Sequence, residues 1–169
     1  MDCREQRGID LHIHSTASDG TLTPAQILDL AQAQLLGAIA ITDHDTIDGS
    51  KEALQVGIPS SLQFLTGVEL SAAPPSFLRR SGSFHILGYG LRLDDDELNQ
   101  TLLVLQQARE NRNPAIIERL GRLGFDMTLD EVVEMVGESQ MGRPHIARVM
   151  LKKGYVHSID EAFVLYLVT

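Results

Sequence analysis

The chain has 169 residues, of which 43% are hydrophobic and 22% charged, and these values fit one soluble globular domain with its own core. Acidic residues outnumber basic ones by 23 to 14, and the formal net charge of −9 argues against a broad basic surface for duplex nucleic acid. No stretch has the length and apolar character of a membrane span, and residues 1–8 lack the apolar core of a signal peptide. We therefore expect a cytoplasmic protein whose partners include neither a membrane nor duplex nucleic acid.

The first part of the chain alternates strand-like and helix-like segments. Four segments have the alternation or the apolar character of strands: 8–14, 38–42, 62–70 and 84–89. After the first of them, Thr23 and Gln26 form the pattern of a capping box around Pro24, which predicts a helix start, and Gly37 predicts the end of that helix. Strands that alternate with helices predict an α/β fold with a mainly parallel sheet whose functional residues lie at strand ends.

The second part of the chain has only helical patterns. Acidic residues 94–97 suit a helix N-terminus, and the helix that follows should kink or break at Asn113-Pro114. Two further capping boxes and a proline-led helix start complete the pattern: Thr128 with Glu131, Ser158 with Glu161, and Pro144. We therefore divide the chain into an α/β part, residues 1–92, and an all-helical part, residues 93–169.

Candidate metal ligands begin in the first predicted strand. His12 and His14 lie two residues apart, so their side chains project from the same face of the strand. Two neighbouring imidazoles at a strand end suit a metal ion, although a His-x-His pattern alone is a weak signal. Asp19 follows in a loop before Gly20, where a lone aspartate more often forms a turn than binds a metal.

The next three predicted strands each deliver a further candidate ligand. The apolar second strand ends in Asp43, His44 and Asp45, and burying three ionisable side chains there is costly without a metal ion or a hydrogen-bond network. The third strand contains Glu69 and the fourth contains His85. One such residue is usually structural, but four consecutive strands that each deliver a ligand type predict a metal centre.

Together these motifs resemble the PHP (polymerase and histidinol phosphatase) family. The segments that carry the resemblance are Ile9 to Gly20, Ile41 to Thr46 and Gly67 to Glu69. The closer similarity is to the stand-alone bacterial branch of metal-dependent phosphoesterases, which resembles nucleoside 3′,5′-bisphosphate phosphatases. Residues 85–90 and 142–147 belong to the pattern of that branch as well.

The resemblance implies the N-terminal part of a distorted (β/α)7 barrel followed by an all-helical insert. It also implies two to three divalent ions, of manganese, zinc or iron, held by His12, His14, Asp19, His44, Glu69 and His85. By motif matching, the two histidines of the first strand hold one ion, and Glu69 bridges that ion to a second one that His85 also binds. The remaining pair, Asp19 and His44, serves a third ion.

The two aspartates beside His44 receive different interpretations. We assign Asp43 to the catalytic machinery, where it would orient ligand imidazoles, and helix capping is the alternative. For Asp45, capping of the following helix is the preferred interpretation. The ions themselves would activate a water molecule and neutralise charge on the phosphoryl oxygens.

Basic residues of the helical part supply candidates for substrate binding. Arg143 and His145 flank a proline at a predicted helix start, where backbone N–H groups and an arginine can hold a phosphate, and a salt bridge inside the insert is the alternative. Arg109 and Arg112 have the spacing of one helix face, and we expect that face to be solvated; the alternative is that either arginine reaches the cleft.

The family pattern continues with a histidine in an Ala-His-Pro setting and a late Asp-x-His, but no histidine follows His157 in this chain. We therefore expect a chain that is truncated at its C-terminus relative to the family. A half barrel would expose sheet edges and apolar helix faces, which favours a homo-oligomer.

The expected function is metal-dependent hydrolysis of a phosphomonoester of a small nucleotide, such as a 3′,5′-bisphosphate. Two neighbouring enzyme activities are alternatives, exonuclease-like trimming of short oligonucleotides and hydrolysis of histidinol phosphate. A non-catalytic metal-binding fragment that assembles as an oligomer is an alternative from a different class.

Overall fold

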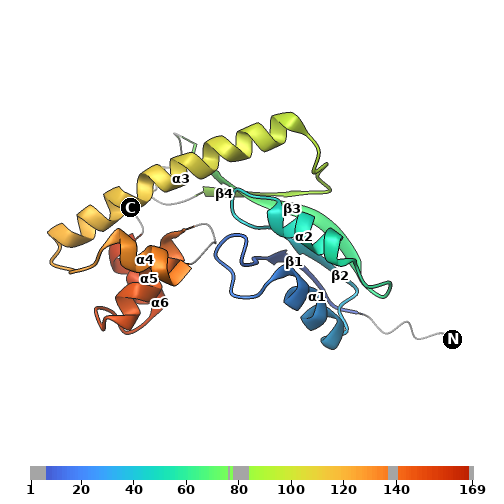
Figure 1. The fold of residues 1–169 in the computed structure, drawn as a ribbon, viewed down its shortest axis with the longest axis horizontal. Helices are drawn as coiled ribbons and strands as arrows, with labels where there is room; N and C mark the ends of the chain where they lie inside the picture. The colour runs from blue at the N-terminus through green and yellow to red at the C-terminus, as the bar shows by residue number, and fades with distance from the viewer. Residues whose placement is uncertain (1–6, 76, 78–83, 137–140, 168–169) are drawn as a thin grey trace.

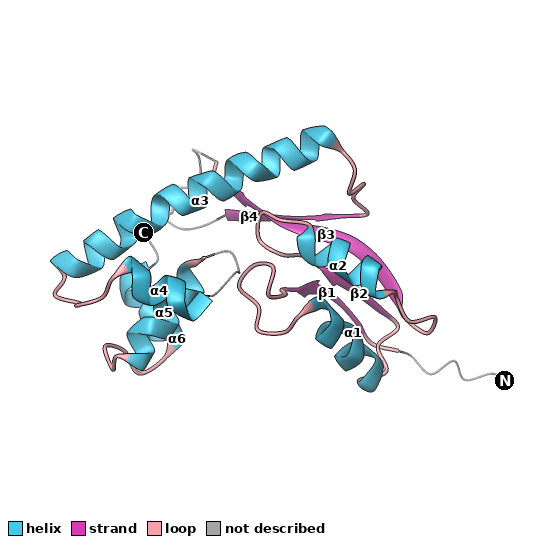
Figure 2. Ribbon diagram, viewed as in Figure 1, coloured by secondary structure: helices cyan, strands magenta, loops and turns pink. Residues whose placement is uncertain are grey.

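The computed structural model describes residues 7–75, 77, 84–136 and 141–167 (Figure 1). A sheet with two helices occupies the N-terminal part, and a long helix leads from it to a group of shorter helices (Figure 2). No helix within these ranges combines the length and the apolar character that a membrane span requires.

The sheet has four strands in the spatial order β1-β2-β3-β4. Their bounds are Ile9–Ile13 for β1, Ala38–Ile41 for β2, Gln63–Ala72 for β3 and Phe84–Tyr89 for β4. The first three strands are parallel, as predicted, and β4 runs antiparallel to β3. Only residues 73–83 connect β3 to β4, which is shorter than the crossover of about a dozen or more residues that a parallel pair needs.

Helices α1 (Pro24–Ala33) and α2 (Asp48–Val56) follow β1 and β2. The capping box of α1 is confirmed, because the backbone N–H of Gln26 donates to Thr23 Oγ1 at 3.3 Å and the Thr23 N–H donates to Gln26 Oε1 at 2.9 Å. The helix ends earlier than the predicted Gly37. The left-handed backbone of Leu35, with φ +55°, turns the chain toward β2 two residues sooner.

The core of this part lies between the sheet and the two helices. Its buried residues are Ile27, Leu28, Ala31, Ile39, Ile41, Ala53 and Leu62. Ile39 and Ile41 lie two residues apart in β2, so they project from the same face of the strand, and they pack against α1 and α2. This packing supports the end of the sheet at which the parallel strands terminate, where the candidate ligands lie.

Helix α3 (Asp96–Arg122) is one continuous helix of 27 residues, so a break at Asn113-Pro114 is wrong, whereas a kink there, the other expectation, stays a prediction. A proline removes one helical hydrogen bond, here the one to the carbonyl of Glu110. Packing on both sides of the proline offsets that loss: Leu102 packs with Ile47 and Val68 of the sheet part, and Leu120 packs into the helical core.

The remaining helices are α4 (Leu129–Val136), α5 (Arg143–Lys152), α6 (Ile159–Ala162) and the π-helical turn η1 (Phe163–Leu167). Their buried residues form a second core with α3: Leu120, Met127, Val132, Ile146, Ala147, Val149, Met150, Val156, Ala162 and Leu167. The domain boundary near residue 92 stays a prediction.

The capping boxes of the second part are confirmed in one case and modified in the other. Thr128 and Glu131 exchange both expected hydrogen bonds, at 2.8 and 3.3 Å. Glu161 donates its N–H to Ser158 Oγ, but its carboxylate accepts from the N–H of His157 and not from that of Ser158. Helix α5 starts at Arg143 and is followed by Gly154, near the predicted end.

Candidate metal centre

The structure brings the six residues predicted as metal ligands together at one end of the sheet, where the parallel strands β1 to β3 end and the antiparallel β4 begins. Glu69 is the common partner. Its Oε2 lies 2.7 Å from His14 Nε2 and 3.0 Å from His12 Nε2, and its Oε1 lies 2.6 Å from His85 Nδ1. Asp19 is the second carboxylate, 2.6 Å from His14 Nδ1 and 3.5 Å from His44 Nε2. Nitrogen and oxygen donors therefore converge on one small region.

The strand geometry explains this convergence. His12 and His14 share one face of β1, and their rings lie 5.2 Å apart. His44, just after β2, forms an isolated parallel bridge with Glu69 of β3. In the antiparallel pair of β3 and β4, His85 lies opposite Ser71, so it is the diagonal neighbour of Glu69 and within its reach. The antiparallel direction of β4 therefore brings His85, its second residue, to the end of the sheet where Glu69 lies.

The six residues form three groups of three whose donor atoms lie within 4.8 Å of one another. The groups are His12, His14 and Glu69; His14, Asp19 and His44; and His44, Glu69 and His85. Each group shares a residue with each of the others. The sharing residues are His14, His44 and Glu69.

This sharing limits how many ions the described residues can hold at once. A neutral imidazole offers one lone pair for a metal, whereas a carboxylate has two oxygens and can bridge. Glu69 can therefore serve two groups at once, but His14 and His44 can each serve only one. The described residues suffice for two ions with three protein ligands each, and Asp19 remains for a further, less complete position.

The charges of the cluster shift the pKa values of its members. Burial raises the pKa of Asp19, but the hydrogen bond from His14 and the charges of His44, His14 and Arg109 outweigh it and lower that pKa to about 2. Burial lowers the pKa of His14, yet Asp19 and Glu69 raise it above its ordinary value. His44 has its pKa lowered to about 4, mainly by burial. A neutral His44 and an ionised Asp19 are the forms that bind a cation.

Asp43 lies beside the cluster, but none of its hydrogen bonds to described residues involves a ligand imidazole. Its buried carboxylate accepts from the N–H and Oγ of Ser15, both at 2.6 Å, and from Ser18 Oγ at 2.7 Å. Ser15 and Ser18 belong to the loop that carries Asp19. The role that the geometry supports for Asp43 is therefore to hold this loop, and its assignment to the catalytic machinery stays a prediction.

Asp45 does not cap a helix, so that expectation is wrong. The N-cap of α2 is Ile47, and the Asp45 carboxylate instead accepts from the N–H and Oγ of Ser71, both at 2.7 Å. It also accepts from Arg109 of α3, at 2.6 Å from one terminal nitrogen. The backbone of Asp45 has φ +55°, a left-handed conformation that aspartate tolerates better than most residues. The bond to Arg109 attaches Asp45, the residue after His44, to α3.

The expectation of a solvated Arg109 is also wrong, because Arg109 is only 7% exposed and pairs with Asp45. Gln106, one turn earlier on α3, donates to the carbonyl of Asp45 at 2.8 Å. The two bonds dock α3 on the segment that follows His44. A sequence distance of 64 residues separates Arg109 from its partner, so no local pattern could have indicated this pair.

The predicted substrate residues lie at the start of α5. Arg143 is half-buried and donates to the carbonyl of Leu167 at 3.3 Å. No salt bridge of Arg143 to another described residue is present, so the alternative interpretation finds no support there. His145 is buried, accepts from the N–H of Gly142 at 3.1 Å, and has a pKa lowered by burial and by Arg148. Neither residue belongs to the three metal-ligand groups.

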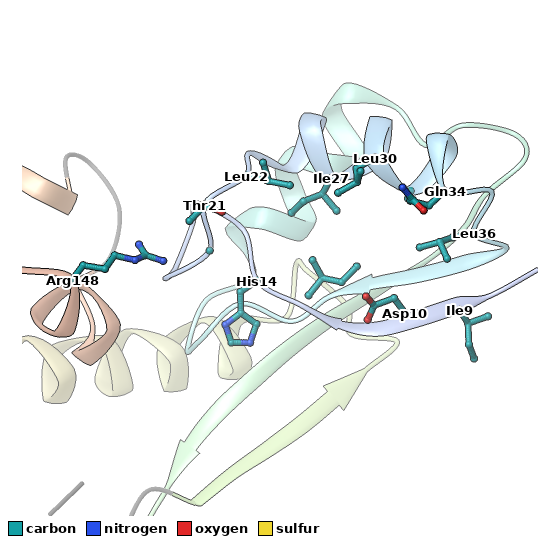
Figure 3. A pocket seen from close by; sticks show the side chains of 13 residues that line it. Ile9, Asp10, His14, Thr21, Leu22, Ile27, Leu30, Gln34, Leu36 and Arg148 are labelled. Carbon is teal, nitrogen blue, oxygen red and sulfur yellow. The ribbon is translucent and has the colours of Figure 1, made fainter. Parts of the chain in front are cut away.

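Arg148 is a residue that the sequence did not indicate. It donates to the backbone carbonyl of Asp19 at 3.3 Å and so links α5 to the loop of that candidate ligand. It also lines a pocket of about 600 Å³ between β1 and α1 (Figure 3). His14 lines the same pocket, whose other walls are mainly apolar side chains such as Leu30 and Leu36. The candidate metal centre therefore borders an apolar space.

Known proteins resemble this chain over nearly its whole length. A 5′-3′ exoribonuclease from Haemophilus influenzae is 34% identical over 160 residues, which cover 94% of this chain and 56% of that protein. A 3′,5′-nucleoside bisphosphate phosphatase from Chromobacterium violaceum is 32% identical over 160 residues, 94% of this chain and 54% of that protein. The chain thus spans about half the length of these curated relatives.

A solved structure shows the same fold. A candidate metal-dependent phosphoesterase from Bifidobacterium adolescentis superposes with a TM-score of 0.83 at 30% identity, covering 95% of this chain and 55% of that chain. The four strands with their helices thus correspond to part of a PHP barrel, as the sequence predicted. The pattern of the PHP domain family matches residues 10–157, most of the chain. The chain belongs to the PHP domain family.

Proposed function

We propose that this protein is a metal-dependent phosphoesterase that hydrolyses a phosphomonoester of a small nucleotide by means of a metal-activated water. The observation that carries the proposal is the convergence of four histidines on Glu69, with Asp19 beside two of them. The relative from Chromobacterium violaceum, a 3′,5′-nucleoside bisphosphate phosphatase, supports a nucleotide with two phosphates as substrate.

We assign the metal ligands to His12, His14, Asp19, His44, Glu69 and His85. Ions bound there would lower the pKa of a water molecule and neutralise charge on the phosphoryl oxygens. The donor set of nitrogen and oxygen atoms suits manganese, iron or zinc. Glu69 would bridge two positions, since each of its oxygens already lies within 3.0 Å of a histidine nitrogen.

The other residues of the site would position these ligands and the substrate. Asp43 would keep the loop of Asp19 in place through Ser15 and Ser18. Asp45 would fix the backbone after His44 through its bonds to Ser71 and Arg109. Arg143 and His145 would contribute to substrate binding from the first turn of α5, the helix whose Arg148 donates to the carbonyl of Asp19.

An exonuclease-like activity on short RNA is the second candidate function. The relative from Haemophilus influenzae, a 5′-3′ exoribonuclease, favours it, and both activities need the same metal-activated water. The chemistry that separates them is the leaving group: an alcohol of a mononucleotide in one case and the next nucleotide in the other. A substrate panel therefore distinguishes them.

The decisive experiment measures phosphate release from nucleoside 3′,5′-bisphosphates, mononucleotides and histidinol phosphate, and release of mononucleotides from 5′-phosphorylated short RNA, with manganese, zinc or iron added. Replacing His14 by Ala should abolish metal-dependent turnover, because His14 contributes to two of the three groups. The matched control is His157→Ala, which removes an exposed histidine outside the cluster and should leave the rate unchanged.

Two results would count against the proposal. Unchanged metal-dependent activity in the His14→Ala variant would refute the ligand assignment. Metal binding by the unmodified chain without turnover of any substrate, also in a longer form of the protein, would favour the non-catalytic alternative.

A further inference from the structure

A second concentration of charge lies where α3 meets the start of α5. Arg109, Arg112 and Asn113 occupy one face of α3, at spacings of three and four residues. Asn113 donates to the carbonyl of Met141 at 3.2 Å and holds the approach to α5 against this face. Arg143 is the first residue of α5. The three guanidinium groups therefore come from two helices that the Asn113–Met141 hydrogen bond links at this place.

Of the three guanidinium groups, that of Arg112 has no hydrogen-bond acceptor among the described residues. Arg109 is bound to Asp45 and Ser71, and Arg143 donates to the carbonyl of Leu167. By contrast, Nε and one terminal nitrogen of Arg112 are buried and have no hydrogen-bond partner among the residues that the structure describes. Buried guanidinium nitrogens without an acceptor are rare, because a buried polar group that makes no hydrogen bond costs free energy.

The surrounding charges do not compensate for this burial. Burial and the positive charges of Arg143 and Arg109 lower the pKa of Arg112 to about 10, and only Asp45 acts in the opposite direction. The carboxylate of Asp45 is already engaged by Arg109. The pKa of Arg143 is lowered as well, by burial and by Arg109. A bound anion would stabilise these neighbouring positive charges, since a guanidinium binds phosphate through two parallel N–H donors.

The position of Arg109 relates this region to the candidate metal centre. Its charge acts on the pKa values of Asp19 and His44 in the cluster, and also on those of Arg112 and Arg143. Through its hydrogen bonds to Asp45 and Ser71, Arg109 is also attached to the segments that follow His44 and Glu69. An anion at Arg112 would be a neighbour of the metal centre without being held by its ligands.

We infer that Arg112, together with Arg143, binds a second, non-reacting phosphate group of the substrate. One part of this inference, that the reacting phosphate lies at the metal centre, rests on the proposed function. The substrate class that fits is a nucleotide with two phosphate groups on separate positions. The anion site itself depends only on the guanidinium groups.

The test uses inorganic phosphate and the whole chain freed of metal with a chelator, so that binding at the metal centre does not contribute. Arg112→Met keeps the apolar stem of the side chain and removes its charge. Titration calorimetry should show affinity for phosphate lower by about tenfold or more, the usual effect of losing a charge-assisted hydrogen bond. The matched control is Arg122→Met, which removes an exposed arginine of the same helix and should bind phosphate like the unmodified chain.

Thermal unfolding separates a binding role from a structural one. Removing an uncompensated buried charge should leave the midpoint of Arg112→Met unchanged or raise it. A lower midpoint together with unchanged phosphate affinity would show a structural arginine and overturn the inference. Phosphate affinity equal to that of the unmodified chain would overturn it at any midpoint.

A further variant separates failure of this inference from failure of the proposed function. His14→Ala should lose metal-dependent turnover but keep phosphate binding in the absence of metal. Arg112→Met should lose phosphate binding but keep metal binding. If turnover is absent in every form and Arg112→Met still loses phosphate binding, the anion site stands and the proposed function falls. Loss of phosphate binding in His14→Ala and not in Arg112→Met would overturn the site.

Discussion

At the scale of single residues, the two aspartates that flank His44 fix different neighbours. Asp43 holds the loop of Asp19, and Asp45 holds α3 and β3. Both carboxylates are almost fully buried, and both have every oxygen engaged by donors. Buried carboxylates are costly unless they are paired in this way. The acidic cluster after β2 therefore combines a candidate ligand with two side chains that maintain its surroundings.

The Asp45–Arg109 pair gives a prediction at this scale. Arg109→Met should lower the free energy of unfolding by about 3–5 kcal/mol, because it leaves a buried carboxylate without its charged partner. Asp45→Asn retains the tolerance for a left-handed backbone and removes the charge. In chemical denaturation the double variant should be more stable than the sum of the two single losses, with a coupling of about 2 kcal/mol.

The exposed pair Glu118 and Arg122 on the same helix is the control for this cycle. Its coupling should be about 0.5 kcal/mol or less, as for other surface pairs at this spacing. Equal coupling in the two cycles would contradict the role that we give to the buried pair.

At the scale of elements, the start of α2 shows how tightly helix and site are packed. Gly49 is buried against Asp43 and Ser15, and a Cβ atom there would lie 2.6 Å from Ser15 Oγ and closer still to Asp43 Oδ2. The helix thus approaches the carboxylate that holds the loop of Asp19. Only a residue without a side chain allows this approach.

Two glycine variants test this packing. Gly→Ala in a helix usually stabilises by about 0.5–1 kcal/mol, and Gly121→Ala in α3 should do so, since nothing lies within 4 Å of its Cβ position. Gly49→Ala should destabilise the fold by about 1–3 kcal/mol and weaken metal binding, because the methyl group displaces Asp43 or Ser15. Thermal unfolding and metal titration measure both effects. Stabilisation by both variants would contradict the packing described for α2.

At the scale of the whole molecule, the shared ligands predict how metal ions stabilise the chain. Two ions should bind tightly, and each should raise the free energy of unfolding by about 2.7 kcal/mol at a free concentration one hundred times its Kd. A chelator should reverse this gain. Elemental analysis of the dialysed protein and thermal unfolding with and without manganese check the prediction. Three tightly bound ions in this chain would contradict the lone-pair limit set by His14 and His44.

The sequence predicted the site better than it predicted what surrounds it. The shared face of His12 and His14 depends on the two-residue period of a strand, which is a local rule. The arrival of His85 beside Glu69 depends on the antiparallel direction of β4, which the sequence did not predict. The partners of Asp45 and Arg148 depend on how α3 and α5 dock, and no local rule determines that. The unbroken α3 has the same cause, since its packing on two cores outweighs the effect of Pro114. The homo-oligomer that the sequence favours stays a prediction.

The proline within α3 divides the helix between the two cores. Arg109 and Arg112 precede Pro114 and belong to the segment docked on the sheet, whereas Arg143 belongs to the helical core that follows. The missing hydrogen bond makes this point the softest one for bending the helix. Bending there would change the separation of Arg112 and Arg143 and would also strain the hydrogen bond between Asn113 and Met141. A ligand bound by Arg112 and Arg143 at once would link the parts of the molecule on the two sides of Pro114. The distance between its two anionic groups would then set the angle between these parts.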